Sequence, residues 1–277
     1  SQLQNTCKML SNEKRISVDL EADSMHCFRE KICLVQFATS REAFLVDPFV
    51  VKDLSAFTSI LSNPHIVKIF HGADFDIRSL DRDYGARVSN LFDTEIACRF
   101  LGVKERGLAA LLKTHFDIHA DKRFQKVDWS KRPLSEDMIA YSVGDVAHLT
   151  RLQDILTAQL VEKGRMEWAK EEFEHQEQVS YNSHQDGPMF IRFKGAGRLD
   201  NRSLAVLENL LTLRYHLAEK KDQPLFKIIA NRSLLMMAVE KPVSVSRMIK
   251  IKALSPRQAD MYGKKCVKAV KDALKME

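Results

Sequence analysis

The sequence predicts an α/β domain followed by a smaller, all-helical domain. The first part of the chain begins with strand-like segments, continues with strands that alternate with helices, and ends in helices. A stretch without periodicity separates this part from the second part, which is helical throughout. The chain has 277 residues, 45% of them apolar, which is enough for two separate cores. We expect the first domain over residues 1–175, a Gly- and Pro-containing linker over 176–199, and the helical domain over 200–277.

Four strands are predicted in the first domain. Residues 16–21, 31–39 and 43–47 are rich in β-branched, aromatic and other apolar residues and are joined by short connections. A helical pattern over residues 51–61 leads to a fourth strand over residues 65–70. Because a helix precedes this strand, we expect it to run parallel to the first strand through a right-handed crossover.

Helices are predicted for most of the remaining chain. In the first domain they lie near residues 74–84, 94–101, 107–115 and 141–163. In the second domain they cover residues 203–220, 225–230, 231–240, 244–251 and 255–275. Asn231 and Ser255 are favourable N-cap residues, and Pro256 suits a first helical position.

Composition argues against several classes of protein. No apolar run approaches the roughly 20 residues of a membrane span, and residues 1–10 lack the pattern of a signal peptide. The five cysteines are dispersed and include no C-x-x-C pair, which argues against a disulfide scaffold or a zinc site. We therefore expect a cytoplasmic protein that does not bind membranes, and we expect it to be a monomer.

Charge is distributed unevenly along the chain. The net charge of +6 combines −3 over residues 1–174 with +9 over residues 175–277. The basic second part favours a polyanionic partner, with a basic surface that has no partner as the alternative.

The segment VDLEAD places two carboxylates on one face of the first strand. Asp19 and Glu21 alternate with Val18 and Leu20, so their side chains point the same way. Like charges so close repel one another and resist desolvation. The strand face is therefore either exposed to solvent or compensated by a positive group.

Two further acidic segments could reach the same point. In HGADFDIRSL, Asp74 and Asp76 follow the fourth strand, where they also suit a helix N-terminus. In YSVGDVAHL, Tyr141 and Asp145 are four residues apart on one helix face, which could also be a solvent-exposed polar stripe. Taken together, these carboxylates can converge at the strand ends of the sheet, and such oxygen ligands suit Mg²⁺ or Mn²⁺.

These segments carry a resemblance to a known family. The segments VDLEAD, CLVQFAT, HGADFDIRSL, LFDTEIACRFLG and DWSKRPLSEDMIAYSVGDVAHL resemble, in this order, those of ribonuclease D, a DEDDy 3′→5′ exonuclease, over about residues 8–172. The segment from LRYHLAEKKDQPLFKIIANRSLL to LSPRQADMYG resembles a single HRDC domain, whereas longer family members carry two. The resemblance implies a ribonuclease-H-like fold and removal of nucleoside 5′-monophosphates from the 3′ end of RNA. It also suggests transfer-RNA precursors as substrates.

The resemblance also implies the site residues. The acidic tetrad falls on Asp19, Glu21, Asp76 and Asp145, which would hold two divalent cations, Mg²⁺ or Mn²⁺, with Tyr141 positioning the attacking water. Spacing alone does not decide between Asp74 and Asp76. His148 lies on the wrong side of Asp145 for the histidine branch of the superfamily, so the tyrosine branch is expected.

Substrate contacts are less specific. In related proofreading exonucleases, an apolar residue four positions after the Glu wedges against the terminal base, and the resemblance places Met25 at that position. Phe28 and His71 are further candidates for substrate contacts. Each of the three could instead pack in the core. The basic run Lys122, Arg123 and Lys126 could contact phosphates or be solvated. A DNA exonuclease and a non-catalytic nucleic-acid-binding protein remain the alternatives.

Overall fold

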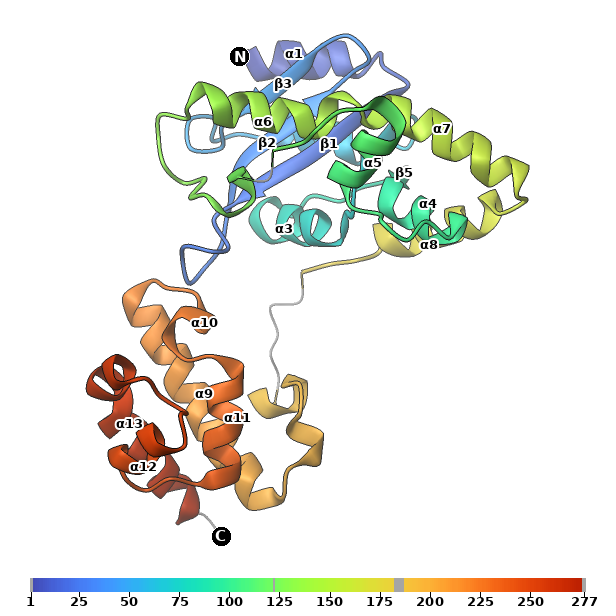
Figure 1. The fold of residues 1–277 in the computed structure, drawn as a ribbon. Coiled ribbons are helices and arrows are strands. Elements are labelled where there is room, and N and C mark those ends of the chain that lie inside the picture. Colours follow the sequence, from blue (N-terminus) through green and yellow to red (C-terminus); the bar gives the residue numbers. More distant parts are fainter. Residues whose placement is uncertain (1, 122, 182–186, 276–277) are drawn as a thin grey trace. The chain divides into compact units, whose positions relative to one another are not determined.

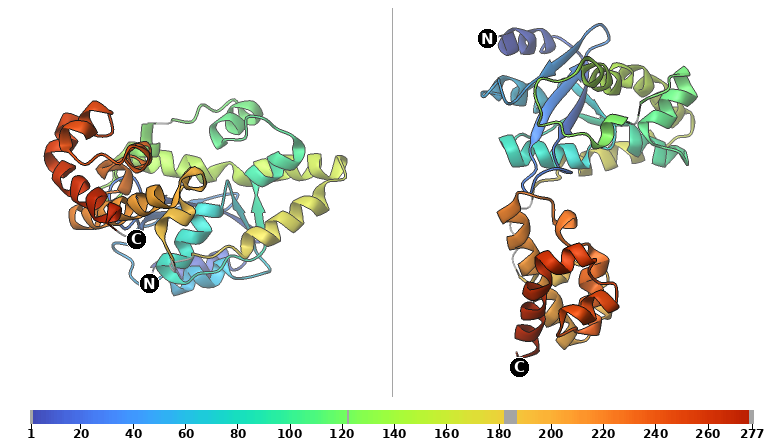
Figure 2. Two further views of the ribbon diagram at one scale, coloured as in Figure 1. Left: turned by 90° about the horizontal axis from the view of Figure 1, so that it is seen from below. Right: turned by 60° about the vertical axis from the view of Figure 1, so that its left-hand side comes forward.

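The computed structural model describes residues 2–121, 123–181 and 187–275. The chain forms two compact units, which are drawn in Figures 1 and 2. Unit 1 contains Ser1–Asp23 and Lys31–Tyr181, and unit 2 contains Ser24–Glu30 and Asn182–Glu277.

Unit 1 is built on a mixed sheet with the strand order β3-β2-β1-β4-β5. Strand β1 pairs antiparallel with β2 and parallel with β4, and β4 pairs parallel with β5. The expected parallel pairing of the first and fourth strands is therefore confirmed. Strand β5 was not predicted, because three residues are too few to show alternation. The strands are β1 (Arg15–Ala22), β2 (Ile32–Ala38), β3 (Ala43–Val46), β4 (Val67–Phe70) and β5 (Leu91–Asp93).

Helices cover both faces of this sheet (Figure 1). On one face, α6 (Glu136–Ala147) contacts β1, β2 and β3, and α7 (Leu149–Glu162) contacts β1 and β4. On the other face, the ring of Phe57 from α2 (Ser55–Leu61) stacks on Phe37 of β2, with centroids 5.3 Å apart. Unit 1 also contains α3 (Asp74–Tyr84), α4 (Thr94–Leu101), α5 (Leu108–Phe116) and a 3₁₀ turn at Arg123–Lys126.

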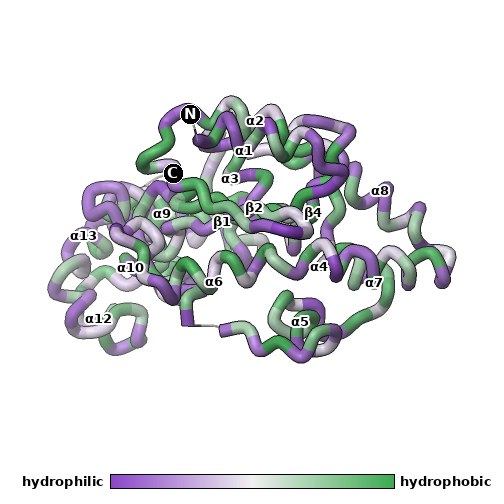
Figure 3. Tube along the Cα trace, turned by 90° about the horizontal axis from the view of Figure 1, so that it is seen from above, coloured by the Kyte–Doolittle hydropathy of each residue, from purple (hydrophilic) through white to green (hydrophobic). Residues whose placement is uncertain are grey.

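Three helical features of unit 1 differ from the prediction. The expected long helix over 141–163 is two helices, which are separated by a turn at His148, where φ is −108° and ψ is −5°. Helices α1 (Gln2–Leu10) and α8 (Met166–Glu177) were not predicted. Helix α8 buries only Ala169 and Phe173. In Figure 3 its colouring is mostly hydrophilic, in contrast to the hydrophobic colouring of β2.

Unit 2 is an all-helical bundle around one core. Its helices are α9 (Asn201–Lys221), α10 (Leu225–Ile228), α11 (Asn231–Glu240), α12 (Val245–Lys250) and α13 (Pro256–Leu274). Ser255 and Gln258 form a capping box at the start of α13, with Pro256 in the first turn, as predicted. The predicted N-cap role of Asn231 is wrong: Ala230 occupies that position, and the Asn231 side chain instead accepts a hydrogen bond from Arg214.

The predicted linker is partly structured. Residues 182–186 lie outside the described residues, but Met189–Arg192 and Ala196–Arg198 form 3₁₀ turns. The backbone N–H groups of Met189 and Phe190 donate to the Glu208 carboxylate of α9 at 3.0 and 2.9 Å. These bonds fix the first turn against the bundle.

The connection between β1 and β2 belongs to unit 2, although the expected boundary placed it in the first domain. The ring of Phe28 meets Tyr215 of α9 edge-on at 5.0 Å, and its backbone N–H donates to Asp222. Arg29 pairs with Glu219 at 3.1 Å. These partners lie about 190 residues away in sequence, so local patterns carried no sign of them.

None of the helices in the ranges described above combines the length and apolarity needed to cross a bilayer.

Candidate active site

Strand β1 directs Asp19 and Glu21 towards the helices that cover one face of the sheet. Ile16, Val18 and Leu20 fill the core on the opposite face, each at most 7% exposed. On the face of Asp19, the Ser17 hydroxyl lies 3.2 Å from the Thr150 hydroxyl of α7. Helices therefore cover this polar face, and a face simply open to solvent does not account for its carboxylates.

The backbone turn after β4 is held by the side chain of Asp93, a role that was not predicted from the sequence. The Asp93 carboxylate accepts hydrogen bonds from the backbone N–H groups of Gly72 and Ala73 at 2.9 and 2.7 Å. The same carboxylate also caps α4 by accepting a hydrogen bond from the backbone N–H of Glu95. Helix α3 then begins at Asp74, directly after the turned segment. The signal for this role was Asp93 at the start of a predicted helix, a common N-cap residue.

The structure places Asp74 and Asp76 in different surroundings, although sequence spacing alone did not decide which of them joins the acidic cluster. Asp76 is only 7% exposed, and its burial together with the nearby charge of Asp19 raises its pKa well above the usual value. Asp74 is exposed and pairs with Arg78 at 3.0 Å, which lowers the pKa of Asp74. Asp76 is therefore the member of the pair that lies with the other carboxylates.

Helix α6 brings Tyr141 and Asp145 to the same place. Ser135 caps this helix by accepting from the Met138 N–H, which sets where the helix begins. One turn apart on α6, the Tyr141 hydroxyl donates a hydrogen bond to the Asp145 carboxylate. The Tyr141 ring packs near Phe124 and Trp129, with centroids 5.6 and 6.0 Å away.

Electrostatics join these side chains into one cluster. Burial, with the charge of Asp145, raises the pKa of Asp19 to about 8. Burial, with the charges of Asp19, Asp145 and Asp76, raises the pKa of Glu21 to about 10. Burial also raises the pKa of Asp145 to about 6, against the opposing effect of the Tyr141 hydrogen bond. The cluster therefore repels itself when all four carboxyl groups are ionised.

Tyr141 remains protonated at neutral pH. Burial, with the charges of Asp145 and Glu21, raises the pKa of its hydroxyl far above the ordinary value near 10. A hydroxyl in this state can donate a hydrogen bond and orient a water molecule, but it cannot act as a general base.

The cluster fits divalent cations by its chemistry. Its donors are carboxylate oxygens, the ligands that Mg²⁺ and Mn²⁺ prefer. Gln36 lies opposite Asp19 in the register of β1 and β2, is fully buried, and has no partner for either side-chain amide atom in the described ranges. An orphaned amide beside the half-buried carboxylate of Asp19 indicates a site that takes additional polar ligands.

The cluster is not a preformed metal cage. Among the residues with described positions, no three His, Cys, Asp or Glu side chains are grouped closely enough to hold an ion as they stand. Binding would therefore have to draw the carboxylates of Asp19, Glu21, Asp76 and Asp145 together, against the repulsion described above.

We expect the protein without metal to lose stability as pH rises from about 4 to about 8, and Mg²⁺ or Mn²⁺ to restore stability at about pH 8. The raised pKa of Asp19, about 8, means that the folded state retains a proton which the unfolded chain releases near pH 4. This contribution is fully present below the unfolded pKa and is lost as pH rises through the folded pKa. Thermal unfolding with chelator or metal at about pH 5 and pH 8 measures the effect.

Asp19→Asn is the matched control, because it removes one of the titrating groups and should flatten the pH dependence. A wild-type melting temperature that is equal at both pH values and indifferent to metal would contradict the prediction.

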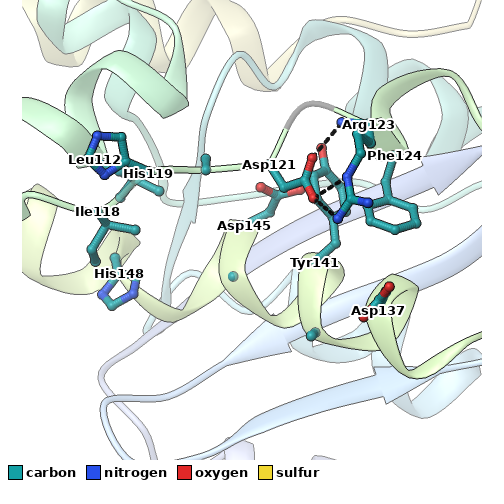
Figure 4. A pocket seen from close by; sticks show the side chains of 13 residues that line it. Leu112, Ile118, His119, Asp121, Arg123, Phe124, Asp137, Tyr141, Asp145 and His148 are labelled. Atoms are coloured by element: carbon teal, nitrogen blue, oxygen red, sulfur yellow. Dashed lines mark hydrogen bonds and ion pairs between the residues drawn. The ribbon is translucent and has the colours of Figure 1, made fainter.

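Within the described ranges, Tyr141 and Asp145 line two pockets beside the cluster. One, of about 280 Å³, is lined by α6 and by residues 118–121, 123 and 124, including His119, Asp121 and Phe124 (Figure 4). The other, of about 380 Å³, is lined by the start of α5, Gln125 and His71. Sequence reasoning missed His119, Asp121, Phe124 and Gln125, which lie in a segment with little periodicity.

His71 has a defined orientation in the second pocket. The Thr94 hydroxyl donates its one proton to the Phe70 carbonyl at 3.0 Å, so it can only accept from His71 Nδ1, which lies 2.9 Å away. This assigns the proton to Nδ1 and leaves Nε2 as an acceptor. Burial lowers the pKa of His71, which favours the neutral ring.

The other predicted substrate contacts are arranged differently. Met25 and Phe28 lie in Ser24–Glu30, the segment that belongs to unit 2, where Met25 is exposed and Phe28 packs on Tyr215. Lys122 lies outside the described residues. Arg123 is paired with Asp121 at 2.6 Å, so its charge is already partly offset.

Comparisons with known proteins identify both parts of the chain. Residues 1–161 match the family described as 3′-5′ exonuclease, and residues 203–270 match the HRDC domain. The chain is 30% identical to ribonuclease D of Zymomonas mobilis, over 96% of this chain and 69% of that protein. It is 40% identical to protein RRP6-like 3 of Arabidopsis thaliana over 58% of this chain, which spans only 18% of that longer relative.

A solved structure agrees with these matches. The catalytic core of RRP6 from Trypanosoma brucei superposes with a TM-score of 0.79 at 27% identity, covering 98% of this chain and 77% of that one.

Proposed function

This chain belongs to the ribonuclease D family of 3′–5′ exonucleases, and we propose that it removes nucleotides one at a time from the 3′ end of RNA. The single observation that carries the proposal is the cluster of Asp19, Glu21, Asp76 and Asp145 with a protonated Tyr141 beside it. Of these four carboxylates, Asp76 is buried and the other three are half-buried. Carboxylates that repel one another in such surroundings destabilise a fold unless cations compensate them. We include transfer-RNA precursors among the proposed substrates.

The four carboxylates would hold two divalent cations, Mg²⁺ or Mn²⁺. When bound, the cations would supply a water of lowered pKa and offset the charge that develops on the phosphate and the departing 3′ oxygen. Asp19 and Glu21 come from β1, the central strand of the sheet, whereas Asp76 and Asp145 come from two helices.

Tyr141 would act through its hydroxyl as a donor. Its packing near Phe124 and Trp129 limits rotation of the ring, so the hydroxyl stays directed at Asp145 and the adjacent pocket. From there it would orient the attacking water towards the phosphorus. The product expected from this direction of attack is a nucleoside 5′-monophosphate.

The test is incubation of a 3′-labelled single-stranded RNA and a DNA of the same sequence with Mg²⁺ or Mn²⁺, followed by identification of the products. We expect stepwise shortening of the RNA, release of labelled 5′-monophosphate and loss of activity with chelator. Faster hydrolysis of the DNA would favour a DNA exonuclease. Internal cleavage, products with a 3′-phosphate, or no turnover with either metal would refute the proposal.

Asp76→Asn should reduce turnover on the order of 10²-fold or more, whereas Asp74→Asn should leave it within about twofold. Asp76 is buried beside Asp19, while Asp74 faces solvent in a pair with Arg78 of the kind that contributes about 0–1 kcal/mol to stability. The two changes are chemically identical and two residues apart, so each controls for the other. Steady-state hydrolysis of a short RNA measures both, and an equal loss in the two variants would refute the assignment.

A further inference from the structure

Unit 2 contains a buried arginine with an unused hydrogen-bond donor. Arg214, on α9, is 6% exposed. Its Nη1 donates to the Ile229 carbonyl at 3.1 Å and to Asn231 Oδ1 at 2.6 Å, which ties down the turn before α11. Its Nε is buried and has no hydrogen-bond partner within the described ranges. The structural role of Arg214 therefore accounts for only part of its guanidinium group.

The charge of Arg214 is also uncompensated. Its two acceptors are a backbone carbonyl and a side-chain amide, both neutral. Burial alone lowers the pKa of Arg214 to about 10, and no carboxylate of the described residues offsets this effect. A buried cation without a counter-charge is costly, and an incoming anion would relieve that cost.

Arg214 lines a pocket with the features of a nucleotide site. The pocket has a volume of about 370 Å³, and two further cations, Arg192 and Lys194, stand at its wall. Its apolar lining includes the half-buried aromatic rings of Phe193 and Tyr215. Phosphates bind where guanidinium and ammonium groups converge, and bases stack on aromatic side chains.

We propose that this pocket, lined by Arg192, Phe193, Lys194, Arg214 and Tyr215, binds a phosphate-bearing nucleotide unit of an RNA strand. The inference rests on the proposed function only in taking RNA as the source of that nucleotide. The pocket is built entirely from unit 2, so its occupancy does not depend on the carboxylate cluster of unit 1.

The test measures binding of a fluorescent single-stranded RNA to the full chain with chelator present, so that no hydrolysis occurs. The double variant Arg192→Ala/Lys194→Ala changes exposed side chains and should not affect folding. We expect its affinity to fall roughly threefold to tenfold and its salt slope to decrease by about 1.4, since each phosphate contact on a single strand contributes about 0.7. Arg198→Ala, an exposed arginine outside the pocket lining, is the matched control and should change neither quantity.

A second variant tests Arg214 itself. Arg214→Met replaces the guanidinium group with an uncharged, shorter apolar side chain. The thermal unfolding of this variant is measured in parallel, because loss of the bonds to Ile229 and Asn231 could loosen the turn before α11. We expect weaker RNA binding in the folded variant. A crosslink from 5-iodouridine RNA to Tyr215 or Phe193 of the wild-type chain gives a readout that does not depend on any substitution.

Unchanged affinity and salt slope in the double variant, or an equal loss in Arg198→Ala, would overturn the proposal and leave only diffuse attraction to a basic surface. Absence of the crosslink would also count against it. Failure of the proposed function would look different: the wild-type chain would not hydrolyse a short RNA with metal, whether or not it bound the strand.

Discussion

Asp19→Asn should reduce hydrolysis at least ~10³-fold, on the order of 4 kcal/mol in the activation barrier, while leaving the fold intact. Asp19 stands at the centre of the cluster: its charge raises the pKa of both Glu21 and Asp76, and the charge of Asp145 acts on it in turn. Replacing it with a neutral amide removes a carboxylate that, in the proposed function, would hold the cations. Single-turnover hydrolysis of a short RNA at saturating metal measures the effect.

Stability separates this prediction from simple unfolding. Without metal at about pH 8, Asp19→Asn should be as stable as wild type or more stable, because one repelling carboxylate is gone. Asp117→Asn is the matched control, since Asp117 is an exposed aspartate at φ 58°, a conformation that asparagine also tolerates. An Asp19→Asn variant that kept more than a tenth of wild-type turnover would exclude the central role.

Tyr141→Phe should lower turnover on the order of 10²-fold and leave metal affinity nearly unchanged at about pH 8. The ring keeps its packing near Phe124 and Trp129, and only the hydroxyl that would orient the water is lost. The change also removes the hydrogen bond that lowers the pKa of Asp145, so that pKa should rise above about 6. At pH 8 Asp145 should remain mostly ionised, whereas nearer pH 6 metal binding should weaken.

Calorimetric titration with Mn²⁺ at both pH values distinguishes the two roles that Tyr141 could have. Collapse of metal affinity at pH 8 would make the tyrosine a structural partner of the carboxylates instead of a positioning residue. Tyr181→Phe is the control, because Tyr181 is 44% exposed and outside the lining of both pockets.

Sequence by itself determined the features that depend on neighbours along the chain. Alternation in β1 separated Ile16, Val18 and Leu20 from Asp19 and Glu21, because successive residues of a strand face opposite sides. The spacing of Tyr141 and Asp145 put both on one face of α6. The N-cap at Ser255 and the order of the acidic segments were readable for the same reason, since each is a local pattern.

Only the tertiary structure decided the features whose partners lie far away in sequence. Asp93, about 20 residues downstream, turns the segment before α3, after which Asp76 lies among the carboxylates while Asp74 faces solvent. Phe28 packs on Tyr215, and Asn231 accepts from Arg214 instead of capping its own helix. Local propensity and periodicity describe which conformations a segment favours. They contain no information on which distant donor, acceptor or ring will satisfy a side chain, because the packing of the whole fold decides that choice.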